Sequence, residues 1–313
     1  MIKLYKYSYP YENMSLNEYI HVIEGESQLV LTMPHSGKEM PEGFPNNLML
    51  KNPEVIKTIN AEVDNCVPNV TRAKEYQTAS RVWTDIARVY LDVNRLRDQL
   101  DQYAIEDGSS EIDAHELIWH ATMTDKKENI QDLLSKPYTE DEFNIMLKNF
   151  YLPYISSIQK LLLDTHSKHG SAIHFDLHSM PGAQPRHVKE GRYKNAYMFD
   201  GNVERGHLEN GHMPDLILMD SGTREDIGNA LIELFKDYNL IIERTSVRPE
   251  GTKGPRQAYF SYEGIFSLGI EIVGHNFEPG RIEGSLKYDN AKEKKFKKAF
   301  TEAFQLLEKF KLS

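Results

Sequence analysis

Residues 174–182, HFDLHSMPG, place three groups that can bind protons or metal ions in a run that otherwise has the apolar pattern of a buried strand. The groups are His174, Asp176 and His178. A buried polar group needs a hydrogen-bond partner, and an unpaired buried charge is costly or shifts its pKa. The three side chains are therefore either paired for structural reasons or part of a functional site.

Three other segments carry polar residues at the end of, or inside, apolar runs. His35 follows QLVLTMP, Asn94 and Arg95 close RVYLDVNR, and Glu271 lies inside LGIEIV. Ligands of open parallel sheets bind beyond the carboxyl ends of the strands, because the loops that follow the strands converge there. We therefore expect these side chains and His178 to gather at one edge of a sheet.

Two histidines and one carboxylate are a common ligand set of catalytic zinc sites. Such sites keep one position open for water, whose pKa the metal lowers to about 7. The histidines here would be His35 and His178, and the segment NAEVDNCV offers Asp64 or Glu62 as the acidic ligand. The pattern predicts a hydrolase with one divalent metal ion, for which zinc is the expected ion.

A metal hydrolase also needs a proton acceptor and a group that holds the substrate. Glu271 suits a general base because its apolar surroundings raise the pKa of a carboxylate toward the working range. Arg95 offers a planar, permanently charged fork for a carboxylate-bearing small-molecule substrate. Arg95 could equally be a structural partner of Asp92 or Asp98.

The two other polar residues of the HFDLH run are assigned structural roles. His174 shares a strand face with His178 through the period of two, and we expect it in the core or behind the ligands. Asp176 is expected on the opposite face, in a buried structural hydrogen bond. Neither is predicted to bind the metal.

Four motifs make the chain resemble the N-formylglutamate amidohydrolase family. They are, in chain order, MPHSGKEMPEGF, ARVYLDVNRLRDQLD, FDLHSMPG and LGIEI, and the likeness extends from about Leu29 to Gly274. That family in turn resembles zinc carboxypeptidases and succinylglutamate desuccinylases. The resemblance implies hydrolysis of the amide C–N bond of an N-acyl amino acid. The leading substrate is N-formyl-L-glutamate, cleaved to formate and L-glutamate at the end of a histidine-degradation route.

The resemblance also implies a role for each matching residue. In chain order these roles are metal ligation by His35, acidic metal ligation by Asp64 with Glu62 as second choice, substrate-carboxylate binding by Arg95 beside Asn94, metal ligation by His178 and general base catalysis by Glu271.

Two segments depart from the family pattern. VGHNFEPG follows the Glu271 strand, and the long basic stretch AQPRHVKEGRYKNAY follows HSMPG. Both are expected near the substrate, so the acyl group and the amino acid stay open. One alternative is a related zinc amidase or carboxypeptidase for another N-acyl amino acid or peptide. Another is a non-catalytic anion-binding protein on the same fold.

The elements that must position these residues alternate between short apolar runs and amphipathic helical patterns, which is typical of an α/β fold. We expect a mostly parallel or mixed central sheet flanked by helices, in the zinc-carboxypeptidase-like (phosphorylase/hydrolase-like) manner. Residues 1–313 are interpreted as a single domain with a helical excursion at about 97–170. Thr139 with Glu142, and Thr223 with Asp226, resemble capping boxes that begin helices. The predicted strands are residues 28–34, 88–94, 171–178, 195–200, 215–220, 239–247 and 267–273.

Composition narrows the classes of partner. The 313 residues carry 37 basic and 47 acidic side chains, for a net charge of -10, and no basic stripe stands out. This argues against nucleic acid as a partner. The one cysteine, Cys66, excludes an internal disulfide. The polar N-terminal stretch has neither a signal h-region nor a transmembrane run, so the cytoplasm is the expected compartment and no membrane is expected as a partner.

Overall fold

The computed structural model of the chain describes residues 17–64, 67, 78–97, 104–106, 117–118, 121–123, 130–180, 215–220, 224–245, 263–273 and 290–310. Its strands are β1 (Ile20–Ile23), β2 (Leu29–Met33), β3 (Ser80–Thr84), β4 (Ala121–Met123), β5 (Ile130–Asp132), β6 (Ala172–Met180), β7 (Leu216–Asp220), β8 (Ile242–Thr245) and β9 (Ile265–Val273). Its helices are α1 (Pro53–Ala61), α3 (Glu140–Met146), α4 (Leu152–His169), α6 (Glu225–Asp237) and α8 (Asn290–Lys309), with one π-helical turn, η2 (Leu147–Tyr151), between α3 and α4.

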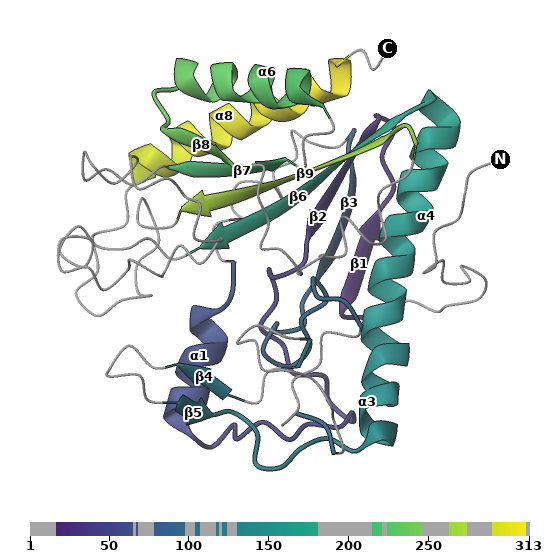
Figure 1. Ribbon diagram of the computed structural model, residues 1–313, viewed down its shortest axis with the longest axis vertical. Helices are drawn as coiled ribbons and strands as arrows, with labels where there is room; N and C mark the ends of the chain where they lie inside the picture. The colour runs from purple at the N-terminus through teal and green to yellow at the C-terminus, as the bar shows by residue number, and fades with distance from the viewer. Residues whose placement is uncertain are drawn as a thin grey trace.

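The described strands other than β4 and β5 form one seven-stranded sheet in the order β1-β3-β2-β6-β9-β7-β8. Strands β3, β2, β6 and β9 are parallel, whereas β1 is antiparallel to β3 and β7 is antiparallel to β9. The mixed sheet flanked by helices confirms the predicted fold class (Figure 1). The carboxyl ends of the four parallel strands meet at one edge, as the metal-site prediction requires.

Alternate residues of the central strands enter two different cores. Leu29 and Leu31 of β2, with Phe175 and Leu177 of β6, pack on the face covered by α6 and α8. Val30 and Ala172 face the other way, into the core that contains buried residues of α3, η2 and α4 (Figure 1). Each fully buried large apolar side chain stabilises the fold by roughly 1.5–3 kcal/mol. Because successive side chains of a strand point to opposite faces, the even-numbered residues of β6 all lie on the face toward α4. They include all the polar residues of HFDLH.

Local chemistry explains some of the described helix ends. Thr139 and Glu142 form the predicted capping box at the start of α3, with each side chain accepting the backbone N–H of the other residue. At the C-terminal end of α4, Gly170 adopts φ 80°, the left-handed conformation that glycine tolerates best. The second predicted capping box is wrong, because the N-cap of α6 is Arg224, which makes no side-chain cap bond and donates from its guanidinium to Asp226.

Five of the predicted strands are present, as β2, β6, β7, β8 and β9, while residues 195–200 lie outside the described residues. The predicted strand at 88–94 is wrong: this segment is a buried series of turns, in which Tyr90 N donates to Ala87 O and Arg95 N to Asp92 O. Its apolar residues are explained by burial in the core. On the side of β2 away from β6 the partner strand is β3, and the sequence pattern predicted neither β3 nor the short edge strand β1.

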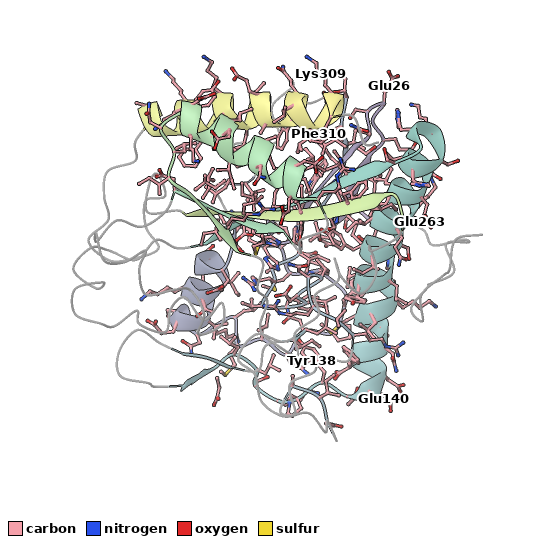
Figure 2. All side chains as sticks on the ribbon, turned by 45° about the horizontal axis from the view of Figure 1, so that its top comes forward. Glu26, Tyr138, Glu140, Glu263, Lys309 and Phe310 are labelled. Atoms are coloured by element: carbon pink, nitrogen blue, oxygen red, sulfur yellow. The ribbon has the colours of Figure 1, made fainter. Side chains whose placement is uncertain are left out.

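The C-terminal helix is attached to the start of β2. The Gln28 amide donates to the carbonyls of Leu307 (2.9 Å) and Phe310 (2.7 Å), and Figure 2 labels Phe310 at the end of α8. These bonds satisfy carbonyls that a helix end leaves without partners. Within residues 97–170 the described part contains the antiparallel strand pair β4–β5 in addition to α3, η2 and α4. The interpretation of the chain as a single domain with a helical excursion stays a prediction. Among the described helices, none has the length and apolar character needed to cross a membrane.

Candidate metal centre

His35 lies two residues beyond the carboxyl end of β2 and is 4% exposed. The turn that carries it depends on Gly37. A Cβ on Gly37 would lie 2.0 Å from the carbonyl carbon of Asp85, which no side chain can tolerate. The absence of a side chain lets the two backbone segments come together, with Gly37 and Ala87 in a parallel bridge. This close approach fixes the path of the chain around His35.

Asp64 follows helix α1 and is 1% exposed. Asn52 caps the start of α1 by accepting from Glu54 N at 3.0 Å, and the helix ends at Ala61. The backbone N–H of Asp64 then donates to His35 O at 2.8 Å. The segment after the helix is thus attached to the β2 turn, which brings Asp64 beside His35.

His178 lies near the carboxyl end of β6, directly opposite Glu271 of β9 in the parallel register. It is 5% exposed. Paired residues of neighbouring strands send their side chains to the same face, so Glu271 leaves the sheet beside His178. The sheet therefore delivers two of the predicted site residues to one position.

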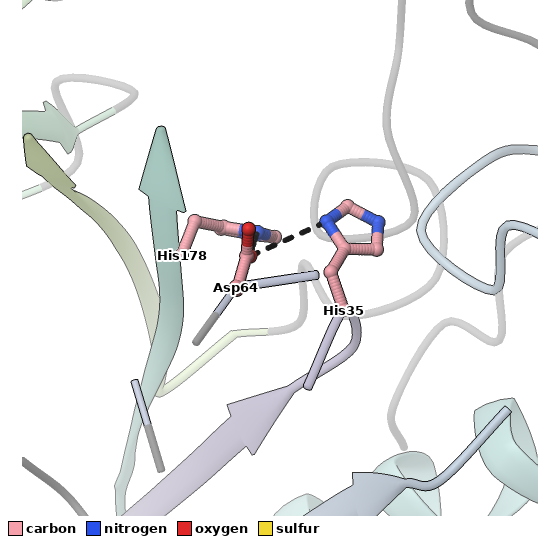
Figure 3. A group of neighbouring side chains, drawn as sticks. All are labelled: His35, Asp64 and His178. Atoms are coloured by element: carbon pink, nitrogen blue, oxygen red, sulfur yellow. Dashed lines mark ion pairs between the residues drawn. The ribbon is translucent and has the colours of Figure 1, made fainter. Parts of the chain in front are cut away.

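His35, Asp64 and His178 come together as a buried group whose possible ligand atoms all lie within 4.8 Å of one another. Asp64 Oδ2 is 3.5 Å from His35 Nδ1 and 3.4 Å from His178 Nδ1, and Figure 3 shows the three side chains together. Ligand atoms at roughly 2.1 Å from one tetrahedral ion lie about 3.4 Å apart, which matches these separations. The group can therefore hold a metal ion.

The Asp64 carboxylate gives an independent indication that this group suits a cation. Both of its oxygens are buried, and neither has a hydrogen-bond partner among the described residues. Leaving a buried carboxylate without hydrogen bonds is costly. A metal ion at this point would satisfy the oxygens, so the residues present fit a divalent cation.

The other nitrogen of each histidine is held by a carboxylate. His35 Nε2 lies 2.8 Å from Asp92 Oδ1, and His178 Nε2 lies 2.9 Å from Asp176 Oδ2. An ionised carboxylate only accepts, so both Nε2 atoms carry the proton. Each histidine then directs Nδ1 toward Asp64, in the arrangement by which outer carboxylates orient metal-binding imidazoles.

Asp92 is the centre of a buried charge network behind His35. Arg88 donates from Nε and Nη2 to Asp92 Oδ2, at 3.3 and 3.1 Å, and Arg95 Nε lies 3.9 Å from the same oxygen. Burial alone would raise the pKa of Asp92, but the charges of His35, Arg88 and Arg95 hold it well below its usual range. Asp92 therefore stays ionised as an acceptor for His35.

The pKa values at the centre reflect competition between burial and charge. Burial lowers the pKa of His178, but Asp176 and Asp64 outweigh it and raise that pKa to about 10. Burial raises the pKa of Asp64, whereas His178 and His35 lower it further than burial raises it. A cation that binds here would replace the proton on His178 Nδ1, because a ligating imidazole must be deprotonated.

Glu271 is half-buried, and burial raises the pKa of its carboxyl group. Asp64 raises it further, while His178, His35 and Arg88 act in the opposite direction. Glu271 therefore lies in the electrostatic field of the metal group, by which we mean His35, Asp64 and His178. A carboxylate with a raised pKa is suited to accept and return a proton near neutral pH.

The remaining predicted residues lie around this group. Glu62 is outside it and forms an ion pair with Arg88 at 3.6 Å, so Asp64 is the acidic member. Asn94 Nδ2 lies 3.2 Å from His178 Nε2. His178 Nε2 is a donor to Asp176 and cannot accept a hydrogen bond from the Asn94 Nδ2 group as well. Rotation of the Asn94 amide by half a turn would place its oxygen at that point as an acceptor, and the two orientations of an amide group are commonly interchangeable.

Two features were not anticipated from the sequence. Asp176 lies on the same face as His178, so the predicted opposite face is wrong; residues two apart in a strand point the same way. The roles of Asp92 and Arg88 behind His35 were also missed. Asp92 is fully buried inside the apolar run VYLDV, and this charged residue among apolar neighbours was the available signal.

Comparison with known proteins identifies the family. The model of the N-formylglutamate amidohydrolase family matches residues 27–235, about two thirds of the chain. The chain belongs to this family. It is accordingly an amidohydrolase.

Two solved structures have a fold similar to that of this chain. An N-formylglutamate amidohydrolase from Ralstonia eutropha JMP134 is similar with a TM-score of 0.67 and 17% identity, over 92% of this chain and 98% of that one. A gene product of Agrobacterium tumefaciens is similar with a TM-score of 0.61 and 12% identity, over 93% of this chain and 95% of that one. No protein with a curated description matches the sequence.

Proposed function

We propose that the protein is a zinc-dependent amidohydrolase that cleaves N-acyl amino acids, with N-formyl-L-glutamate as the leading substrate. The observation that carries the metal dependence is the buried Asp64 carboxylate, which has no hydrogen-bond partner among the described residues and lies between two imidazole Nδ1 atoms. Family membership supports the reaction and the substrate.

The donor set favours zinc among common divalent ions. Two imidazole nitrogens and one carboxylate oxygen suit zinc, whereas magnesium and calcium prefer oxygen ligands. His35, Asp64 and His178 would hold the ion. When bound, zinc supplies Lewis-acid polarisation of the acyl carbonyl and lowers the pKa of a water molecule.

Glu271 carries the proton in this proposal. Its carboxylate accepts a proton from the attacking water and then donates that proton to the nitrogen of the leaving amino acid. Two features support this role: the register that places Glu271 beside His178, and the burial that raises its pKa. Without the returned proton, the amine would have to leave as a poor anionic leaving group.

Arg95 binds the carboxylate of the substrate in this proposal, beside Asn94. The Arg95 side chain is one quarter exposed, and its Nε is 3.9 Å from Asp92. A guanidinium offers a planar fork that can bind a carboxylate through two hydrogen bonds, and the ion pair with Asp92 limits the freedom of this side chain. The side-chain amide of Asn94 lies 3.2 Å from His178 Nε2, so this residue is next to the group that would hold the metal ion.

Formate and L-glutamate as products would place the reaction at the end of histidine degradation, as the family resemblance implies. The segments that depart from the family pattern, residues 183–197 and 274–280, lie outside the described residues. The choice of acyl group therefore depends on experiment. The alternative substrate class is another N-acyl amino acid or a peptide.

The test combines metal analysis with product release. Protein reconstituted with zinc should contain about one zinc per chain and release equal amounts of formate and glutamate from N-formyl-L-glutamate. A chelator should stop the reaction, and added zinc should restore it. N-acetyl-, N-succinyl- and N-formyl-amino acids with other side chains, assayed by free amine, define the specificity.

Three outcomes would contradict parts of the proposal. Bound zinc with cleavage of a different N-acyl amino acid would replace the substrate but keep the mechanism. Failure to bind zinc, with activity unaffected by chelators, would remove the metal from the mechanism. Zinc bound without cleavage of any amide in the panel would contradict the proposed reaction and favour a binding protein on the same fold.

A further inference from the structure

A largely buried series of hydrogen-bonded polar side chains extends behind His178 and has no part in the proposed reaction. It begins at Ser267 on β9, whose hydroxyl lies 2.8 Å from His174 Nδ1. His174 Nε2 lies 2.8 Å from the Thr32 hydroxyl on β2, and that hydroxyl donates to Asp176 Oδ1 at 2.7 Å. Asp176 Oδ2 then accepts from His178 Nε2 at 2.9 Å. Three neighbouring strands thus contribute side chains to one hydrogen-bonded chain.

The strand register explains why these side chains meet. Thr32 is paired with Asp176, His174 with Ser267, and His178 with Glu271, all on the sheet face toward α4. The exposed fractions are 1% for Thr32, 0% for His174 and 3% for Asp176. Apolar side chains at these positions would pack without any need for partners, so the polar residues are costly unless each hydrogen bond is made.

Counting protons gives the chain a single direction. The hydroxyl of Thr32 has one proton, which goes to the Asp176 carboxylate. His174 Nε2 must therefore carry the proton of the bond to Thr32. A fully buried imidazole is favoured in its uncharged form, which has one N–H, so Nδ1 accepts from the Ser267 hydroxyl. Every donor from Ser267 onward points toward Asp176.

We propose that Ser267, His174 and Thr32 are positioning residues that hold Asp176 so that it accepts from His178 Nε2–H and keeps His178 Nδ1 directed toward Asp64, where the metal ion would bind. Asp176 Oδ1 is fixed by Thr32, which leaves Oδ2 to face His178. Without the Thr32 bond the carboxylate could rotate about its Cβ–Cγ bond, and the orientation of the imidazole would loosen. The inference rests on the proposed function only for the metal itself.

The first test uses the metal affinity of Thr32 variants. Thr32→Val keeps the shape of the side chain and removes the hydroxyl. Loss of an outer partner of a metal ligand costs roughly 10–100-fold in affinity, and we expect a loss of about 10-fold in zinc affinity, measured by chelator competition. Thr32→Ser, which restores the hydroxyl, should recover most of that loss. With saturating zinc, KM should change less than kcat.

A control separates positioning from stability. Ser80→Ala removes another buried strand hydroxyl, which accepts from Gly25 N at 2.9 Å at the opposite end of the sheet. Its melting temperature should fall, but its zinc affinity should stay that of the parent protein. Zinc affinity unchanged in Thr32→Val, or lowered equally in Ser80→Ala, would overturn the proposal.

The second test needs neither metal nor activity. Long-range ¹H–¹⁵N NMR of the metal-free protein reports which imidazole nitrogen carries a proton. We expect His174, identified as the imidazole whose signals shift in Ser267→Ala, to be protonated on Nε2 alone. A His174 ring protonated on Nδ1, alone or with Nε2, would reverse or break the chain and overturn the inference, even if Thr32→Val failed to fold.

The two proposals fail in different ways. If the parent protein binds no zinc, the metal proposal fails, while the NMR measurement still tests the direction of the chain. If the parent binds zinc and Thr32→Val binds it equally well, the positioning inference fails and the metal proposal stands.

Discussion

His178 and Glu271 occupy paired positions on the neighbouring parallel strands β6 and β9. Their side chains therefore leave the sheet on one face, at the edge where the carboxyl ends of the parallel strands meet. One is a member of the buried metal group, and the other has a raised pKa in the field of that group. A member of the group that could hold a metal ion and the proposed proton acceptor are thus placed side by side by strand register.

Glu271→Gln should separate proton transfer from binding. The amide keeps the size of the carboxyl group but cannot accept the proton, so kcat should fall by roughly 10²–10⁴-fold. The zinc content should remain that of the parent, because Glu271 is not a proposed ligand. Single-turnover kinetics, bound metal and melting temperature from one preparation provide the measurement. Near-normal turnover in a zinc-loaded variant would remove Glu271 from the mechanism.

Asp64→Asn should abolish tight metal binding. The substitution removes the anion between the two imidazoles, so zinc affinity should fall by more than the roughly 10–100-fold that loss of an outer partner costs. Glu62→Gln is the matched control, since this nearby carboxylate pairs with Arg88 and lies outside the metal group. Equal zinc affinity in both variants, measured by chelator competition, would show that Asp64 is not a ligand.

Asp92→Asn should affect both metal binding and stability. His35 Nε2–H would lose its charged acceptor, and zinc affinity should fall by roughly 10–100-fold. Arg88 would lose its closest counter-charge, and breaking a buried ion pair costs about 3–5 kcal/mol in free energy of unfolding. Urea unfolding of the metal-free protein measures the second effect separately. A variant as stable as the parent would mean that Asp92 does not hold the Arg88 charge.

Arg95→Lys should weaken substrate binding while charge is retained. An ammonium cannot reproduce the bidentate fork of a guanidinium, so the substrate Kd should rise, with zinc content unchanged. The control is Arg97→Lys, an exposed arginine two residues further along the chain. If both variants bind N-formyl-L-glutamate as the parent does, Arg95 is a structural partner of Asp92.

The sequence by itself was sufficient to predict the amidohydrolase family and much of the sheet. Strands β2, β6, β7, β8 and β9 were predictable because continuous apolar runs are typical of buried strands. The grouping of His35 with His178 followed from the rule that parallel strands deliver their carboxyl ends to one edge. Residue type and order along the chain were sufficient for these predictions, since each depends on local pattern.

Only the tertiary structure decided which carboxylates surround the histidines. The choice of Asp64 over Glu62 depends on where α1 ends and on the bond from Asp64 N to His35 O, which no local pattern contains. The run RVYLDVN was predicted as a strand but is a set of turns that places Asp92 against His35, because burial in a core gives turns and strands the same apolar composition. The contacts of Thr32 with His174 and Asp176 depend on the pairing of β2 with β6, strands separated by more than a hundred residues. Such pairing is set by the packing of the whole sheet. The reactive residues could therefore be predicted from the sequence, whereas the groups that they contact were determined by the tertiary structure.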